Sequence, residues 1–252
     1  MKKIAVCNQK GGVGKTATAV NITAALSLAE RTTLLVDIDP QANASSGLGV
    51  DYNNLEISIY ECILDPQVTR SAIMKTKWPR LWVLPSTPDL AGAEIELVEQ
   101  DGRERKLKNI LDLIEGEYDF GIIDCPPSLG ILTVNALVAC DSVIIPIQCE
   151  YYALEGLEKL LKTLKRIKTD LNPNLVIEGI LLTMYDARLN LAKDVVEDIQ
   201  SHFPDVVFRT VVPRSVRVAE SPSYGKSVIH YNISSSGAQA YLNLVRELLN
   251  HA

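Results

Sequence analysis

Short runs of apolar residues alternate along the chain with stretches whose apolar residues recur at helical spacing. The continuous runs predict six buried strands, at 3–8, 33–36, 81–84, 120–123, 143–147 and 176–182. The stretches with helical spacing predict helices at 16–28, 105–114, 129–138, 154–167, 191–202 and 238–249. Strands that are apolar throughout and separated by helices are typical of a mostly parallel, twisted sheet with helices on both faces. We therefore predict an α/β fold with right-handed crossovers.

The composition is that of an ordinary globular protein. The chain has 252 residues, of which 47% are hydrophobic and 22% charged, which is enough to form a sizeable core. The sequence shows no Pro/Ser-rich linker, internal repeat or low-complexity tract, so we expect a single domain over residues 1–252. The first residues, MKKIAVCNQKGG, lack the apolar stretch of a signal peptide, and no apolar run approaches the length of a membrane span. We therefore expect a cytoplasmic location.

Cysteine content and charge narrow the function classes. Five scattered cysteines, with no C-x-x-C pair, favour free buried thiols in a reducing compartment over a metal or iron–sulfur site. The formal net charge of −6 excludes a chain that is basic throughout. Binding to nucleic acid would therefore depend on a local basic patch.

A glycine-rich segment, QKGGVGKT at residues 9–16, separates the first predicted strand from the first predicted helix. Its glycines let the backbone fold closely around an anion, and the start of a helix adds a positive partial charge. Lys15 supplies a full charge for the β- and γ-phosphates of a nucleotide, and Thr16 supplies a hydroxyl for Mg²⁺. The standard phosphate-loop pattern needs glycine where this chain has Gln9, and Lys10 is an additional lysine. The residues predicted to bind the nucleotide here are Lys10, Gly11, Gly12, Val13, Gly14, Lys15, Thr16 and Ala17.

Two acidic motifs follow predicted strands, VDIDPQ at 36–41 and IIDCPPS at 122–128. Because the carboxyl ends of parallel strands meet at one edge of a sheet, these acids should lie beside a ligand held by the glycine-rich segment. An apolar strand that ends in an acid is typical of a magnesium site. Asp124 is therefore predicted to lie near Mg²⁺, and to act through water because Mg²⁺ dehydrates reluctantly. The plainer alternatives are a turn-forming acid before proline for Asp39 and a helix or turn cap for Asp124.

The segment KGGVGKT, with its early lysine, resembles the signature of the deviant Walker A ATPases, a family that includes ParA, MinD and the nitrogenase iron protein. The resemblance implies a P-loop ATPase that binds ATP and Mg²⁺ and forms a homodimer with ATP. It implies that Lys10 reaches the partner's nucleotide and that Asp39 positions the attacking water, while Asp37 supports Mg²⁺ through water. Lys10, Lys15 and Asp39 are then the predicted catalytic residues, and turnover should be slow because the nucleotide state is the signal.

Four later segments are similar to the ParA/Soj partition ATPases in particular: 41–48 (QANASSGL), 148–156 (QCEYYALEG), 183–188 (TMYDAR) and 212–222 (VPRSVRVAESP). The resemblance implies a nucleoid-associated ATPase for chromosome or plasmid partitioning. Such an ATPase binds nonspecific double-stranded DNA in the ATP state and is stimulated by a ParB-like centromere-binding partner. Ala17 stands where the family usually has a second threonine, and Asn43 and Ser221 stand where glycine and alanine are common. None of these departures removes a catalytic group.

The resemblance assigns DNA binding to Arg188, Arg214 and Arg217. Arginine suits this work because its planar fork bonds two phosphate oxygens at once. Phosphate contacts carry no sequence information, so the binding should be nonspecific and sensitive to salt.

Other surface residues have weaker assignments. Pro213 is expected near the adenine, flanked by Tyr185 and Asp186, although ordinary loop residues are the alternative for all three. The lysine-rich stretch at 158–168 would add to a DNA surface. An exposed lysine face is usually only a solvated face, and we favour that interpretation here.

Rival functions fit the sequence less well than the partition ATPase, with one exception. A membrane-cycling ATPase resembling MinD needs a basic amphipathic helix at the C-terminus, whereas residues 240–252 have only Arg246 as a firm positive charge, next to Glu247. We therefore expect no membrane partner. An electron-transfer ATPase resembling the nitrogenase iron protein needs converging cysteines, which no spacing supports. A metabolic ligase of this fold and an inactive interaction module are less favoured. The exception is a cargo-positioning ATPase resembling ParA, which shares every motif and stays open.

Overall fold

The strands form one mostly parallel sheet. In the computed structural model, which describes residues 1–150 and 153–250, the strand order is β3-β4-β2-β5-β1-β6-β7-β8. Every neighbouring pair is parallel except β3 and β4, which are antiparallel. This arrangement confirms the predicted fold class. The strands are β1 (Lys2–Val6), β2 (Thr33–Asp37), β3 (Met74–Lys75), β4 (Leu81–Leu84), β5 (Phe120–Asp124), β6 (Ser142–Gln148), β7 (Val176–Tyr185) and β8 (Val207–Pro213).

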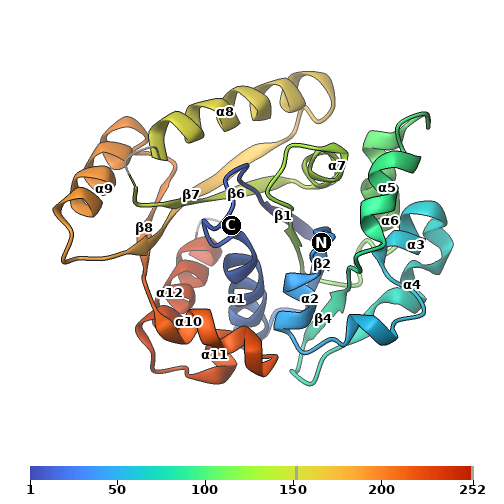
Figure 1. Cartoon of the computed structure of the whole chain (residues 1–252), viewed down its shortest axis with the longest axis horizontal. Coiled ribbons are helices and arrows are strands. Elements are labelled where there is room, and N and C mark those ends of the chain that lie inside the picture. Colours follow the sequence, from blue (N-terminus) through green and yellow to red (C-terminus); the bar gives the residue numbers. More distant parts are fainter. Residues whose placement is uncertain (151–152, 251–252) are drawn as a thin grey trace.

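Helices cover both faces of the sheet. Figure 1 shows α7 and α8 above it and α1 and α12 below it. The α-helices are α1 (Lys15–Leu28), α2 (Asn43–Gly47), α3 (Ile59–Leu64), α4 (Thr69–Ala72), α5 (Leu90–Glu96), α6 (Lys106–Asp112), α7 (Ile131–Ala139), α8 (Ala153–Asp170), α9 (Asn190–His202), α10 (Val216–Glu220), α11 (Val228–Tyr231) and α12 (Ser236–Asn250). Short 3-10 turns complete the fold: η1 (Tyr52–Asn54), η2 (Pro66–Val68), η3 (Arg103–Arg105) and η4 (Ser221–Tyr224).

Two hydrophobic cores lie on opposite faces of the sheet. Alternate residues of a strand point to opposite faces, so Ala5 of β1 packs in the core that includes α7 and α8. Its neighbours Ile4 and Val6 pack in the core that includes α1 and α12. Because both faces are covered, nearly every position of the central strands is buried. This is why the strands are recognisable in the sequence as continuous apolar runs.

The six predicted strands and six predicted helices all appear, and the differences lie at the edges and in short elements. The strands β3 and β8, which the sequence does not predict, are the two edges of the sheet. The strand β3 has only two residues, both exposed, and Arg209 and Thr210 interrupt the apolar run of β8. The unpredicted helices, α2 to α5, α10 and α11, have four to seven residues each. Such lengths are too short for a helical repeat to show in the sequence.

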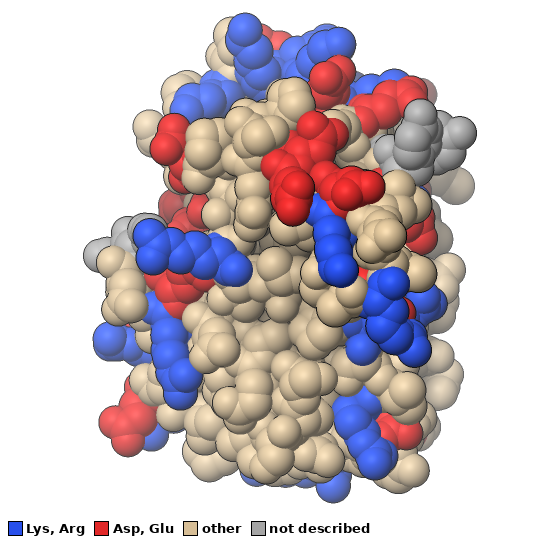
Figure 2. All heavy atoms as spheres, turned by 90° about the vertical axis from the view of Figure 1, so that its left-hand side faces the viewer, with Lys and Arg blue, Asp and Glu red and all other residues tan. Residues whose placement is uncertain are grey.

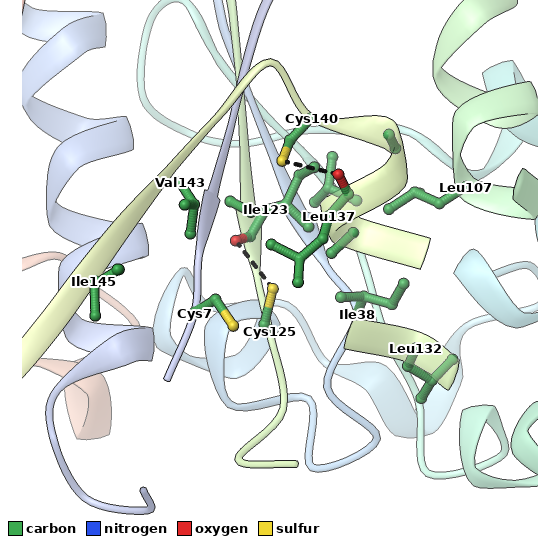
Figure 3. Close-up of a cluster of buried hydrophobic side chains, with 14 of the residues drawn as sticks. Cys7, Ile38, Leu107, Ile123, Cys125, Leu132, Leu137, Cys140, Val143 and Ile145 are labelled. Carbon is green, nitrogen blue, oxygen red and sulfur yellow. Dashed lines mark hydrogen bonds between the residues drawn. The ribbon is translucent and has the colours of Figure 1, made fainter. Parts of the chain in front are cut away.

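The five cysteines are all free and buried, as predicted. Figure 3 shows Cys7 and Cys125 side by side in the core, with Cys140 nearby. Burial raises the pKa of the Cys140 thiol, so this thiol stays protonated and unreactive. These cysteines act as small apolar side chains in the core.

Candidate functional site

The glycine-rich segment forms a loop between β1 and α1 at the carboxyl edge of the sheet. Gly12 and Gly14 have φ angles of 75° and 86°, which residues with a side chain rarely adopt, so glycine is required at both positions. The hydroxyl of Thr183 in β7 donates a 2.9 Å hydrogen bond to the carbonyl of Val13. This bond fixes the loop against a strand that is distant in sequence.

Asn8 holds the start of the loop by hydrogen bonds, a role that the sequence analysis missed. Its side-chain amide donates to the carbonyl of Pro146 in β6 at 2.7 Å, and its side-chain oxygen accepts from the backbone amide of Lys10 at 3.0 Å. The side chain therefore joins the start of the loop to β6. The available signal was a polar asparagine at the end of the apolar run 3–8.

The Lys15 side chain lies over the loop. It is almost fully buried, and its Nζ donates to the carbonyl of Lys10 at 3.1 Å. Burial lowers the pKa of Lys15, and the nearby Asp124 carboxylate opposes this effect. The ammonium group is thus held where the loop glycines expose their backbone amides, as phosphate binding requires.

Asp37 and Asp124 lie opposite each other on neighbouring parallel strands, β2 and β5. The oxygens of Asp37 accept hydrogen bonds from the amide and hydroxyl of Ser45, at 2.8 and 2.7 Å, and from the amide of Asp39 at 3.1 Å. Burial nevertheless raises the pKa of Asp37 to about 6. The carboxylate fixes the start of α2, and its predicted water-mediated support of Mg²⁺ stays a prediction.

Asp124 differs, because both of its carboxylate oxygens are buried and have no hydrogen-bond partner among the described residues. Burial, followed by the charge of Asp37, raises its pKa well above the usual value, and the Thr16 hydroxyl partly offsets this. A buried carboxylate of this kind is costly unless a cation neutralises it. Thr16 and Asp124 therefore fit the prediction of a magnesium site.

The magnesium ligands would not be a preformed cage of protein side chains. Among residues 1–150 and 153–250, no group of three or more His, Cys, Asp or Glu side chains is placed to hold a metal ion. A magnesium ion at Thr16 would then take its other ligands from waters and the phosphates of the nucleotide, and the role of Asp124 through water stays a prediction.

Two cavities meet at the phosphate loop. The larger, about 880 Å³, extends from Thr16 and Ala17 to Pro213, and thus has room for a nucleoside beside the loop. The smaller, about 680 Å³, extends from the same two residues to Asp39. Pro213, which is predicted to lie near the adenine, is therefore in the same cavity as Thr16. Asp39 lies on the other side, where its carboxylate accepts from the amide of Gln41 at 2.9 Å.

Lys10 points away from this site. Its Nζ forms a 2.8 Å ion pair with Glu150, and about half of each side chain is exposed. Lys10 is absent from the described linings of both cavities. Within one chain the second lysine of the signature is thus paired with a surface acid that the sequence analysis did not identify. Tyr151 and Tyr152, which follow Glu150 in a segment similar to ParA/Soj, lie outside the described residues.

Two of the arginines predicted to bind DNA, Arg188 and Arg214, come together because β7 and β8 are neighbours. Tyr185 pairs with Pro213 in the sheet, and the amide of Arg214 donates to the carbonyl of Tyr185 at 2.9 Å. Arg188 and Arg214 both line the mouth of the larger cavity. The segments 183–188 and 212–218 therefore belong to both the cavity and the surface around it.

Two of these arginines are paired with nearby acids. Arg188, with 88% of its side chain exposed, bonds Asp186 at 2.6 Å and lowers the pKa of Asp186 to about 2. Arg217 pairs with Glu220. Figure 2, the left-hand face in Figure 1, shows acids gathered in its upper part and Lys and Arg side chains flanking a largely uncharged lower half. One copy of the chain therefore has separate positive groups on this face, with no continuous basic surface.

The lysine-rich stretch at 158–168 lies on α8 with its lysines exposed. Figure 1 shows α8 along the upper edge of the molecule, whereas α10, which contains Arg217, lies along the lower edge. The stretch is therefore separate from Arg217 and fits a solvated helix face, the interpretation favoured from the sequence.

Comparisons with known proteins show which proteins the chain is similar to. A family model described as an AAA domain matches residues 1–177. The chain is 55% identical over 246 residues to the chromosome partitioning protein ParA of Myxococcus xanthus, covering 98% of this chain and 87% of that protein. It is 52% identical over 247 residues to the sporulation initiation inhibitor protein Soj of Bacillus subtilis, covering 98% of each. The structure of cobyrinic acid a,c-diamide synthase from Mycobacterium smegmatis, with bound ADP and magnesium, matches with a TM-score of 0.88 at 38% identity, covering 99% of this chain and 94% of that chain.

Replacement of Asp124 by asparagine tests the cost of its unpaired carboxylate. The folded-state pKa is raised, so the ionised carboxylate destabilises the nucleotide-free protein as pH rises above about 4, the unfolded value. Asp124→Asn should therefore become more stable than the parent as pH rises from 4 to 8 in thermal unfolding without Mg²⁺. It should also gain less stability from Mg²⁺ with ATP.

The matched control is Asp170→Asn, an exposed acid at the end of α8. This variant should follow the parent in both experiments. Identical pH profiles for Asp124→Asn and the parent would show that the Asp124 carboxylate does not destabilise the folded protein. Identical responses to Mg²⁺ with ATP would show that Asp124 takes no part in binding them.

Proposed function

Because the chain belongs to the ParA/Soj family of chromosome-partitioning ATPases, we propose that it is an ATP-driven dimerisation switch that partitions a chromosome or a plasmid. The proposal rests on two segments that line the larger cavity and also contain the arginines predicted to bind DNA. Residues 183–188 and 212–218 line the nucleotide cavity and also include Arg188, Arg214 and Arg217. A nucleotide in the cavity would thus contact the same loops that present the DNA-binding arginines.

The chemistry is the transfer of a phosphoryl group from ATP to water. Backbone amides of the loop and the Lys15 ammonium bind the β- and γ-phosphates, and Mg²⁺ when bound neutralises phosphate charge. Thr16 and Asp124 hold that ion, Asp124 through water. Asp39 orients the attacking water in the smaller cavity, on the other side of the loop from Pro213. Because catalysis of this kind depends on positioning and charge, turnover by one chain alone should be slow.

ATP joins two copies of the chain, and each copy contributes Lys10 to the other's phosphates. Dimerisation replaces the ion pair between Lys10 and Glu150, whose atoms are 2.8 Å apart. Half-exposed ion pairs contribute only about 0–1 kcal/mol, so this interaction is easily exchanged for bonds to phosphate. ATP favours the dimer to the extent that it binds the dimer better than the single chain.

Dimerisation in turn controls DNA binding. Each copy has only a few separated arginines on its surface, and two of them are paired with acids. Two such patches on one dimer raise the overall affinity by avidity, without any new contact. A ParB-like partner stimulates hydrolysis and so releases the dimer from DNA. The protein would then be cytoplasmic and nucleoid-associated.

The membrane-cycling alternative is not favoured by the position of α12. Its apolar side chains, which a lipid-binding helix would expose, are buried in the core: Tyr241, Leu244, Val245 and Leu248. Among the described residues, no helix is both long enough and apolar enough to cross a bilayer. We therefore propose DNA as the surface on which this ATPase acts.

Replacement of Lys10 tests the cross-subunit role. Lys10→Ala should bind ATP with nearly the parent affinity, because Lys10 does not contact the phosphates of its own chain. ATP-dependent dimerisation, measured by sedimentation, should weaken on the order of tenfold or more, because the variant cannot form a charged bond to the partner's phosphates. Lys159→Ala removes a comparable lysine, paired with Glu155 on α8, and should dimerise as the parent does. Full ATP-dependent dimerisation of Lys10→Ala would contradict the cross-subunit role.

Binding to random-sequence duplex DNA tests the proposed function itself. With ATP the chain should bind DNA, with ADP or no nucleotide it should not, and affinity should fall steeply with salt. The Asp39→Ala variant should stay bound after the parent has hydrolysed its ATP and dissociated. Binding to anionic liposomes in place of DNA would favour the membrane-cycling alternative and reject the arginine assignment.

A further inference from the structure

The turn between β3 and β4, residues 76–80 (TKWPR), is an exposed basic element that the proposed function does not yet use. From residue 67 to residue 88 the chain has four basic residues and no acid, although its net charge is −6. Of the four, Arg70 pairs with Glu117. Lys75, Lys77 and Arg80 are exposed and form none of the ion pairs among the described residues.

The turn is held in a fixed conformation. The Thr76 hydroxyl donates to the carbonyl of Leu81 at 2.8 Å and accepts from the amide of Trp78 at 3.1 Å. The carbonyl of Arg80 accepts from the amide of Thr33 in β2 at 2.9 Å. Phosphate binding by a fixed turn costs less conformational entropy than phosphate binding by a flexible loop.

Aromatic stacking joins this turn to α11. The rings of Trp78 and His230 are 3.7 Å apart and almost parallel, and Lys77 Nζ lies 5.1 Å from the centre of the Trp78 ring. Burial, then the charges of Lys77 and Lys226, lower the pKa of His230 to about 4. His230 is therefore neutral at physiological pH, and the positive potential around it comes from the two lysines.

A second aromatic contact joins α11 to η4, which directly follows α10, the helix that contains Arg217. Tyr231, next to His230, stacks on Tyr224 with ring centres 4.9 Å apart. The helix α11 also packs directly against α10. Figure 1 shows α10, α11 and the turn before β4 along the lower edge of the molecule. The turn therefore packs against α11, and α11 packs against η4 and α10.

We propose that Lys77 and Arg80 bind the phosphates of the same DNA duplex as Arg188, Arg214 and Arg217, and so extend the DNA surface around the molecule's lower edge. The inference rests on the proposed function. Lys75 is left out because it lies in the edge strand β3, where lysine also prevents pairing with other sheets. Lys77 and Arg80 lie in the turn beyond that strand, where no such role applies. Because Lys77 and Arg80 would contact only DNA phosphates, they would add affinity and salt dependence without sequence preference.

The salt dependence of DNA binding separates direct phosphate contacts from indirect effects. The full chain with ATP and a random-sequence duplex is compared with Lys77→Gln/Arg80→Gln between 50 and 200 mM salt. The slope of log affinity against log salt should become shallower by about 0.9 for each phosphate that the variant no longer neutralises. Two such phosphates for each copy of a dimer would change it by up to about 4, and affinity at moderate salt should fall on the order of tenfold or more.

The matched control is Lys162→Gln/Lys165→Gln, which removes the same charge from the exposed face of α8 on the opposite edge. Its slope should equal that of the parent. Thermal midpoint, ATP binding and ATP-dependent dimerisation should be the same in all three proteins, which excludes misfolding as the cause.

The outcomes separate this inference from the function on which it rests. If the parent binds DNA with ATP and Lys77→Gln/Arg80→Gln has the slope of the control, the inference is wrong and the proposed function stands. A fall in affinity with an unchanged slope also contradicts it, because removal of a direct bond to phosphate must change the slope. If the parent does not bind DNA with ATP, the proposed function fails and this inference fails with it.

Discussion

The parallel register of β1, β2 and β5 is the constraint on which the rest of the site depends. It places Val6, Asp37 and Asp124 at the same level of the sheet, directly before the phosphate loop and its neighbouring acids. Asp37 is fully hydrogen-bonded, whereas Asp124 is buried with both oxygens unpaired among the described residues. The ionised form of Asp124 is therefore destabilised in the nucleotide-free protein, and a further cation at the phosphate loop would stabilise it. Binding of nucleotide with magnesium would lower the free-energy cost of burying the Asp124 carboxylate.

A second pair of strands connects this site to the surface. Thr183 in β7 holds the phosphate loop through Val13, and the ends of β7 and β8 form the wall of the larger cavity. The same strand ends lead directly into the segments with Arg188, Arg214 and Arg217. A nucleotide and a DNA duplex would therefore contact the same two segments, so no long-range pathway is needed to couple them.

The sequence was sufficient for the fold class and for the phosphate loop because both depend on local patterns. Continuous apolar runs reveal strands covered on both faces, and Gly12 and Gly14 are needed for the backbone they form. The edge strand β8 was missed because only some of its residues are buried, so its sequence is not a continuous apolar run. Its backbone amides at Arg209 and Thr210 donate to the carboxylate of Glu247 in α12.

Contacts between distant segments could not be predicted from the sequence. Nothing in it joins Lys10 to Glu150 or Trp78 to His230, because these pairs are brought together only by the tertiary fold. For the same reason the assignment of phosphate binding to particular arginines rests on the resemblance alone. The structure adds that two of the three line the cavity mouth and that two are paired with acids.

The central claim is that one pair of segments responds to nucleotide and presents the DNA-binding arginines. Hydrogen exchange of the full chain with Mg²⁺ and a non-hydrolysable ATP analogue, compared with ADP and with no nucleotide, tests it directly. The account predicts that residues 183–188 and 212–218 become protected together with the phosphate loop, most strongly with the ATP analogue. Protection of the phosphate loop with no change in either segment would contradict it.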